Sequence, residues 1–180
     1  MKKLFMMTAL ITVMMVASVC SAIGRNEFSL GGIYLNMPYN SVIKMYGQPT
    51  SHPGGWAQLV TDCIKYGNDV EIGFCNKKVR YVTVTANNGW KTPSGVYVGM
   101  SINDVIRKYG SNYTTENQSV RFDHQREHLL TSLEGTQYIW TQVRNDVYTY
   151  DPGDTSYRVS VVVSNGVVNA IVLDQITPEY

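Results

Sequence analysis

Two groups of side chains in this sequence have residue types and spacings that could support chemistry. The first is residues 124–128, which read His-Gln-Arg-Glu-His, the H-x-x-E-H pattern of inverted zinc peptidases. On a helix, His124 and His128 would lie on one face and could bind zinc, with Glu127 as the general base. A third ligand would have to come from the few acidic residues that follow. We therefore expect no metal site here and no catalysis by His124 and His128.

The second group is the pair Cys63 and Cys75. These two are all that remain of three cysteines once residues 1–22 are removed, and an exported protein keeps an even number of cysteines as disulfides. Pairing them across a hairpin would place Ile64 opposite Phe74 and gather the apolar residues on one face. The spacing fits neither a redox C-x-x-C motif nor a zinc knuckle. We therefore predict a Cys63–Cys75 disulfide.

Residues 1–22 have the pattern of an export signal. A positively charged start precedes an uncharged apolar run over residues 4–19, and the small residues that follow predict cleavage after Ala22. The run is shorter than the roughly 20 residues that a membrane-spanning helix needs. Lipid attachment at Cys20 is the alternative, although Val19 is not the small residue that a lipobox has before its cysteine. The pattern predicts a secreted or periplasmic protein with no membrane span in the mature chain.

Charge and motif content argue against several classes of function. The chain of 180 residues has a formal net charge of +1, which becomes −1 when Lys2 and Lys3 leave with the signal. A nearly neutral protein has no electrostatic basis for binding nucleic acid or an anionic membrane surface. The sequence contains no P-loop, no G-x-G-x-x-G and no G-x-S-x-G motif. We expect no enzyme activity and no cofactor.

A duplicated segment dominates the organisation of the chain. Residues 32–47 read GIYLNMPYNSVIKMYG, and residues 95–110 read GVYVGMSINDVIRKYG, so the two align without a gap. Self-similarity of this kind indicates a duplicated structural unit. We expect repeat 1 over residues 23–90 and repeat 2 over residues 91–180, with a helical insertion near 118–134.

Each repeat is expected to contain one short helix followed by antiparallel strands. In repeat 2, Ser101 is a good N-cap and Gly110 stands at the C-cap position. Residues 111–117 read as a polar loop, and Asn165-Gly166 is a strong hairpin signal. The strands are predicted at 63–66, 70–75 and 79–85, and again at 147–150, 157–163 and 167–173. These elements predict an α+β fold of two tandem repeats, each a short helical element packed on an antiparallel β-sheet.

The shared motif, with its glycine and methionine before the helix and its closing Tyr-Gly, resembles the β-lactamase-inhibitor-protein-like superfamily. That superfamily includes tandem-repeat secreted proteins and the small lipoprotein of the outer-membrane barrel assembly machine. The resemblance covers roughly residues 30–175 and implies binding rather than catalysis. It does not imply β-lactamase as the partner, because the inhibitory contact residues have no match in this sequence.

The face of the sheet away from the core is the predicted working surface. A register set by the Asn165-Gly166 turn places apolar residues on this face, where they either pack against the neighbouring repeat or bind a partner. The predicted partner-binding residues are Tyr81, Val162, Ile171 and Leu173, with Lys65, Glu71 and Arg158 as a polar rim.

Three functional hypotheses follow from the sequence. The first is a secreted or periplasmic, non-catalytic, inhibitor-like module that binds a protein of unknown identity. The second is an accessory protein of cell-envelope assembly. The third, which the sequence favours least, is a zinc-dependent peptidase that uses the H-x-x-E-H residues.

Overall fold

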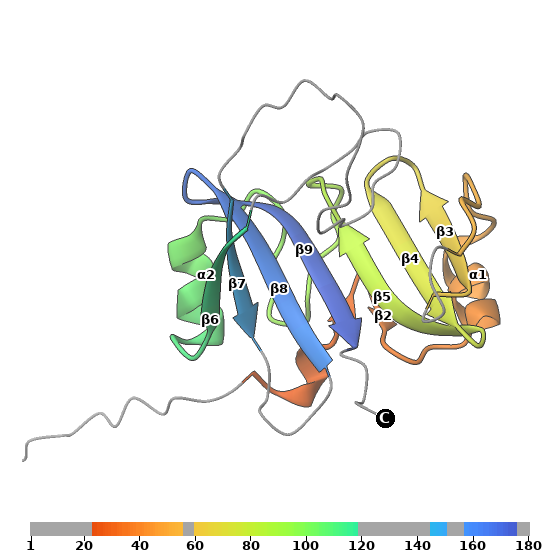
Figure 1. The fold of residues 1–180 in the computed structure, drawn as a ribbon, viewed down its shortest axis with the longest axis horizontal. Helices are drawn as coiled ribbons and strands as arrows, with labels where there is room; N and C mark the ends of the chain where they lie inside the picture. The colour runs from red at the N-terminus through yellow and green to blue at the C-terminus, as the bar shows by residue number, and fades with distance from the viewer. Residues whose placement is uncertain (1–22, 56–59, 119–144, 151–156, 176–180) are drawn as a thin grey trace, which may run out of the picture.

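One antiparallel sheet of seven strands dominates the computed structural model (Figure 1). The structure describes residues 23–55, 60–118, 145–150 and 157–175. The strand order is β3-β4-β5-β9-β8-β7-β6, and β1 and β2 form a separate two-stranded sheet. The elements are a 3-10 helix (Arg25–Glu27), β1 (Ser29–Leu30), β2 (Ile33–Tyr34), α1 (Tyr39–Tyr46), β3 (Asp62–Tyr66), β4 (Val70–Cys75), β5 (Lys78–Val84), α2 (Ile102–Tyr109), β6 (Thr114–Gln118), β7 (Asn145–Tyr150), β8 (Tyr157–Ser164) and β9 (Val167–Gln175).

The expected α+β class is wrong, because the described residues are mostly β. The two α-helices among them, α1 and α2, have 8 residues each. The predicted repeats also lack separate sheets, since β5 pairs with β9 and makes the sheet continuous from β3 to β6. Figure 1 shows this continuous sheet, with α1 and α2 at its opposite ends. Residues 114–118 form the edge strand β6 instead of the expected loop.

The two helices begin and end at the residues that the sequence indicates. The Ser101 side chain accepts a hydrogen bond from the Asp104 backbone N–H at 3.2 Å, which caps α2. Gly47 and Gly110 follow the two helices with φ of 79° and 83°, a conformation that glycine adopts readily. Helices this short depend on tertiary packing for their stability.

The same backbone hydrogen bonds recur in the two halves of the molecule. In each half, the loop before the α-helix pairs with the start of that half's last strand. In the first half, Asn36 N donates to Val79 O (2.8 Å), Val79 N to Met37 O (2.9 Å) and Tyr39 N to Lys77 O (2.8 Å). In the second half, Gly99 N donates to Val168 O (2.8 Å), Val168 N to Met100 O (2.9 Å) and Ile102 N to Gly166 O (2.9 Å). Each helix is therefore attached to the sheet in the same way.

The strand registers recur as well, including a β-bulge at the same place in each half. Five pairs of the first half each have a counterpart in the second. Val70↔Val84 corresponds to Val159↔Leu173, Gly73↔Tyr81 to Val162↔Ala170, Phe74↔Val79 to Val163↔Val168, Cys63↔Gly73 to Val147↔Val162, and Lys65↔Glu71 to Thr149↔Ser160. Each residue of β4 and β5 thus has a structural equivalent in β8 or β9. The second half is therefore an internal reference for what the fold requires of the first.

The two halves meet where β5 pairs with β9. The pairs at this seam are Val82↔Leu173, Thr83↔Val172 and Val84↔Ile171. Because Ile171 and Leu173 are the equivalents of Val82 and Val84, the register is symmetric about the Thr83–Val172 pair. The pairing of β5 with β9 therefore has local twofold symmetry about this pair.

The helices cover one face of the sheet, and the main core lies there. Val42 of α1 and Val105 of α2 are fully buried in that core. The opposite face, which we call the outer face, carries a smaller buried cluster formed by Val147, Val162 and Ala170. The outer face is where the predicted working surface has to be sought.

Candidate functional site

The bulge in β9 overturns the predicted centre of the working surface. Asn169 has no partner in the β8–β9 register, so it is an extra residue in β9. One extra residue moves the side chains that follow it in the strand to the opposite face of the sheet from the face that simple alternation predicts. Ile171 and Leu173 are therefore fully buried in the main core, so their prediction as partner-binding residues is wrong. Val162 does lie on the outer face, but it is buried in the smaller cluster.

The structure does bring Tyr81, Lys65 and Glu71 together on the outer face. The Tyr81 hydroxyl donates to the Glu71 carboxylate, and Lys65 Nζ lies 3.5 Å from Glu71 Oε2. The Tyr81 ring covers Gly73, where any Cβ would overlap the ring. Glu71 is only 6% exposed, so the ion pair is largely buried. We call Cys63, Lys65, Glu71 and Tyr81 the outer-face cluster.

Arg158 lies across the seam from this cluster. It binds Asp174 through two hydrogen bonds of 2.6 Å each, from Nε to Oδ1 and from Nη2 to Oδ2. Asp174 is also the cross-strand neighbour of Tyr81. A bidentate arginine–carboxylate pair has a fixed planar geometry, so this pair forms an ordered polar border to the cluster.

The predicted disulfide between Cys63 and Cys75 is contradicted by the structure. Cys63 pairs with Gly73 rather than with Cys75, and both thiols are free. The Cys63 Sγ instead lies 3.4 Å from the Tyr81 hydroxyl oxygen. Burial raises the pKa of the Cys63 thiol to about 12. The thiol is therefore protonated at neutral pH and poorly suited to act as a nucleophile.

The second half shows that the fold does not require the outer-face cluster. The equivalents of Cys63, Lys65, Glu71 and Tyr81 are Val147, Thr149, Ser160 and Ala170. There the apolar residues pack together, and the hydroxyls of Thr149 and Ser160 lie 3.3 Å apart. Burying an ion pair costs desolvation free energy that apolar residues avoid. The first half thus carries a polar cluster where the same strands accept small and apolar side chains.

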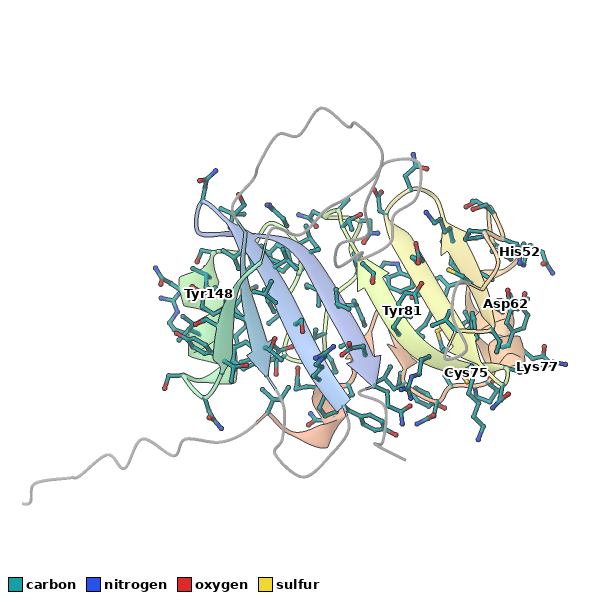
Figure 2. The ribbon with its side chains drawn as sticks, in the orientation of Figure 1. His52, Asp62, Cys75, Lys77, Tyr81 and Tyr148 are labelled. Carbon is teal, nitrogen blue, oxygen red and sulfur yellow. The ribbon has the colours of Figure 1, made fainter. Side chains whose placement is uncertain are left out.

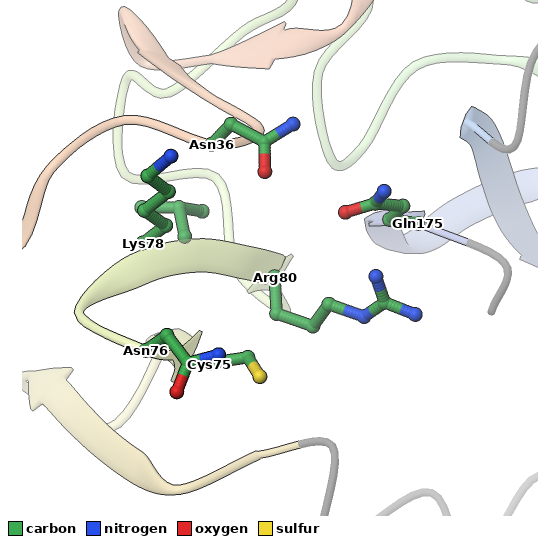
Figure 3. Close-up of a pocket in the computed structure, with 7 residues that line it drawn as sticks. Asn36, Cys75, Asn76, Lys78, Arg80 and Gln175 are labelled. Carbon is green, nitrogen blue, oxygen red and sulfur yellow. The ribbon is translucent and has the colours of Figure 1, made fainter. Parts of the chain in front are cut away.

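A second candidate site is an open depression of about 240 Å³ at the turn between β4 and β5. Figure 3 shows its six polar lining residues, Asn36, Cys75, Asn76, Lys78, Arg80 and Gln175. These residues come from three segments that lie far apart in the sequence, so no local motif identifies the site. The closely spaced lysines and arginine of residues 77–80 are the one signal in the sequence that could have drawn attention to it.

Several sequence predictions fall outside the described residues. These are the export signal over residues 1–22, all but the first residue of the insertion near 118–134, and the histidines and glutamate of the H-x-x-E-H pattern. Among the residues that the structure describes, no three His, Cys, Asp or Glu side chains gather in a group that could hold a metal ion. Within those same ranges, no helix has the length and apolar character needed to cross a membrane.

No protein-family model matches the chain, and neither does any curated protein. The chain is similar to the 1.5 Å crystal structure of an extracellular protein containing an SCP domain from Bacillus anthracis str. Ames, with 13% sequence identity and a TM-score of 0.45. The similarity covers 78% of this chain and 44% of that one. The chain therefore spans less than half the length of that protein, and a likeness at this level does not identify a family.

Proposed function

We propose that the protein is an exported, non-catalytic module that binds another protein through the outer face of its first half. The observation that carries the proposal is the outer-face cluster, because the second half builds the same strands without it. Tyrosine is among the residues that most often dominate the binding energy of protein interfaces, and Tyr81 lies at the centre of the cluster. Export rests on the sequence pattern of residues 1–22.

The chemistry of the cluster suits recognition better than reaction. Burial raises the pKa of Tyr81 as well as that of Cys63, so neither group supplies a nucleophile or a base near neutral pH. Lys65 and Glu71 offset each other's charge at 3.5 Å. An antiparallel sheet that packs helices on one face can use its other face for contacts. The half-buried Tyr81 ring thus offers a partner an aromatic centre, and the buried polar groups beneath it hold the ring in place.

The test replaces the cluster with the residues that the second half already uses. A triple variant, Tyr81→Ala, Lys65→Thr and Glu71→Ser, installs the equivalents Ala170, Thr149 and Ser160 and is expected to fold. Circular dichroism and thermal unfolding check that expectation. Tyr34→Ala is the matched control, because Tyr34 is a tyrosine with 50% exposure that lies outside the cluster.

The readout is quantitative capture of partner proteins from the envelope and medium fractions of the source cell. The wild type and Tyr34→Ala should retain the same partner in equal amounts, and the triple variant should lose it by about tenfold or more, as expected for a hot spot. A folded triple variant that captures the same proteins in the same amounts would overturn the proposal. Recovery of the protein only from the cytosol would overturn its export.

A further inference from the structure

We propose that the depression at the β4–β5 turn is a binding site for a carboxylate group. It is built from Asn36 before α1, from the β4–β5 hairpin, and from Gln175 at the end of β9. Lys78 and Arg80 supply two positive charges, and the carboxamides of Asn76 and Gln175 supply N–H donors. The Asn36 carboxamide already donates to the Tyr157 hydroxyl at 2.5 Å, which leaves one N–H of its Nδ2 for a ligand. The described residues that line the depression include no acidic side chain.

The positive charges at this site have no acidic partner in the described part of the chain. Lys78 and Arg80 form no side-chain ion pair or hydrogen bond with any described residue. Asp174, the acid next to Gln175 in the chain, is bound through both oxygens by Arg158. Like charges gathered in a hollow attract a ligand of opposite charge.

The second half forms the same turn without this charge. The equivalents of Asn36, Cys75, Lys78 and Arg80 are Gly99, Ser164, Val167 and Asn169. Among the polar lining residues, Asn76 has an identical equivalent, Asn165, and both asparagines have the positive φ that the turn requires. The fold therefore does not explain why the first half places two cations and a thiol here.

Lys77 adds a third positive charge at the turn, in an unfavourable conformation. Its φ is 60°, and its equivalent in the second half is Gly166 with φ of 76°. A side chain in the left-handed region costs conformational free energy that glycine avoids. Figure 2 shows Lys77 and Cys75 at the same end of the β4–β5 hairpin, and Lys77 itself does not line the depression. The first half thus holds a lysine beside the depression where the turn itself favours glycine.

A carboxylate fits this set of donors. The planar fork of the Arg80 guanidinium matches the two oxygens of a carboxylate. Figure 3 shows the Lys78 side chain extending towards Asn36 rather than towards the guanidinium, so its ammonium group adds attraction at longer range. The carboxylate could belong to a free organic acid or to an acidic side chain of a protein, and both sources present the same group. The depression shares no residue with the outer-face cluster, so either proposal can fail without the other.

The first test is a titration of the full chain with citrate, followed by NMR shifts of backbone amides. The wild type should show saturable shifts around the depression. The double variant Lys78→Val and Arg80→Asn carries the second half's residues and should bind at least about tenfold more weakly, as expected for loss of charge-assisted hydrogen bonds. Lys91→Ala removes an exposed lysine outside the depression and should leave binding within about twofold of the wild type.

The Cys75 thiol supplies an independent readout, because it is partly exposed while Cys63 is fully buried. Its reaction rate is measured with the dianionic reagent 5,5′-dithiobis(2-nitrobenzoate) and with neutral 4,4′-dithiodipyridine, and Cys75→Ser gives the background from other thiols. The positive charges should favour the dianionic reagent. Citrate should slow that reagent selectively, and the double variant should lower the ratio of the two rates several-fold.

Comparison of citrate with other anions tests both the site and its ligand class. Citrate shifts of equal size in the wild type and the double variant would overturn the site. Tighter binding of inorganic phosphate than of citrate would overturn the assignment to a carboxylate. A peptide of four glutamates is compared with citrate to identify the source: tighter binding of the peptide indicates a protein side chain, and tighter binding of citrate indicates a free acid.

Discussion

Replacing Lys77 with glycine should make the protein more stable. Lys77 has φ of 60°, and its exposed side chain forms no ion pair or hydrogen bond with the described residues. A left-handed conformation costs a side-chain-bearing residue roughly 1–2 kcal/mol, while glycine adds about 0.4–1 kcal/mol of entropy to the unfolded chain. The difference between the midpoints of these two ranges is a gain of about 0.8 kcal/mol in the free energy of unfolding. For a chain of this length that raises Tm by about 1–4 °C.

The corresponding turn of the second half allows the reverse experiment. Gly166 has φ of 76° and no atom within 4 Å of the position that a Cβ would occupy. Gly166→Lys therefore adds backbone strain without a clash, and it should lower the free energy of unfolding by about 0.5–1 kcal/mol. Urea unfolding of the wild type and both variants measures the changes, and equal m-values would show that the variants expose the same surface on unfolding.

Two results would refute this reasoning. An unchanged or lowered stability of Lys77→Gly would show that the turn does not strain the lysine. A neutral Gly166→Lys would show that the second turn tolerates a side chain at positive φ without cost. The hydrogen bond from Tyr39 N to Lys77 O joins two backbone atoms at 2.8 Å. Lys77→Gly therefore retains this bond, and the measured change in stability reflects the side chain alone.

Two further predictions concern the outer-face cluster. Gly73→Ala should destabilise the protein by about 1–3 kcal/mol, because the new Cβ would overlap the Tyr81 ring. In a Tyr81→Ala background the same change should cost much less. A double-mutant cycle of unfolding free energies measures the difference, and simple additivity of the two changes would contradict the overlap. Folding raises the pKa of the Cys63 thiol from 9.0 to about 12. As pH rises, the unfolded chain therefore loses this proton at a lower pH than the folded protein does. The free energy of unfolding should fall as pH rises from about 9 towards 12. Cys63→Val should flatten that fall in urea unfolding at several pH values, and parallel curves for the two proteins would refute the assignment.

Local features of this fold can be predicted from the sequence because their signals are local. Ser101 caps α2 through its own side chain, and Asn165-Gly166 has the two positive φ values of its turn. The strands β3 and β4 also lie close to their predicted positions. The predicted register is wrong by two residues, and a shift of two residues leaves every side chain on the same face. Alternation of apolar and polar residues therefore cannot distinguish Cys63 opposite Cys75 from Cys63 opposite Gly73.

The features that the sequence does not reveal depend on long-range geometry. Nothing local to Asn169 marks it as an extra residue in β9, yet the bulge there moves Ile171 and Leu173 into the core. The pairing of β5 with β9 joins strands from the two halves of the chain, so the continuous sheet could not be read from either half alone. The depression likewise exists only because Asn36 and Gln175 meet the same hairpin.

The symmetric register between β5 and β9 bears on self-association. A twofold contact of this kind uses the same surface on both partners and is complete once two of them have joined. A fragment that ended after β5 would expose that strand as an unpaired edge, and unpaired edges recruit foreign strands. In the intact chain, β5 of the first half and β9 of the second half pair with each other, so neither strand is left as an open edge. The pairing of β5 with β9 thereby protects from strand addition two strands that would otherwise be open edges.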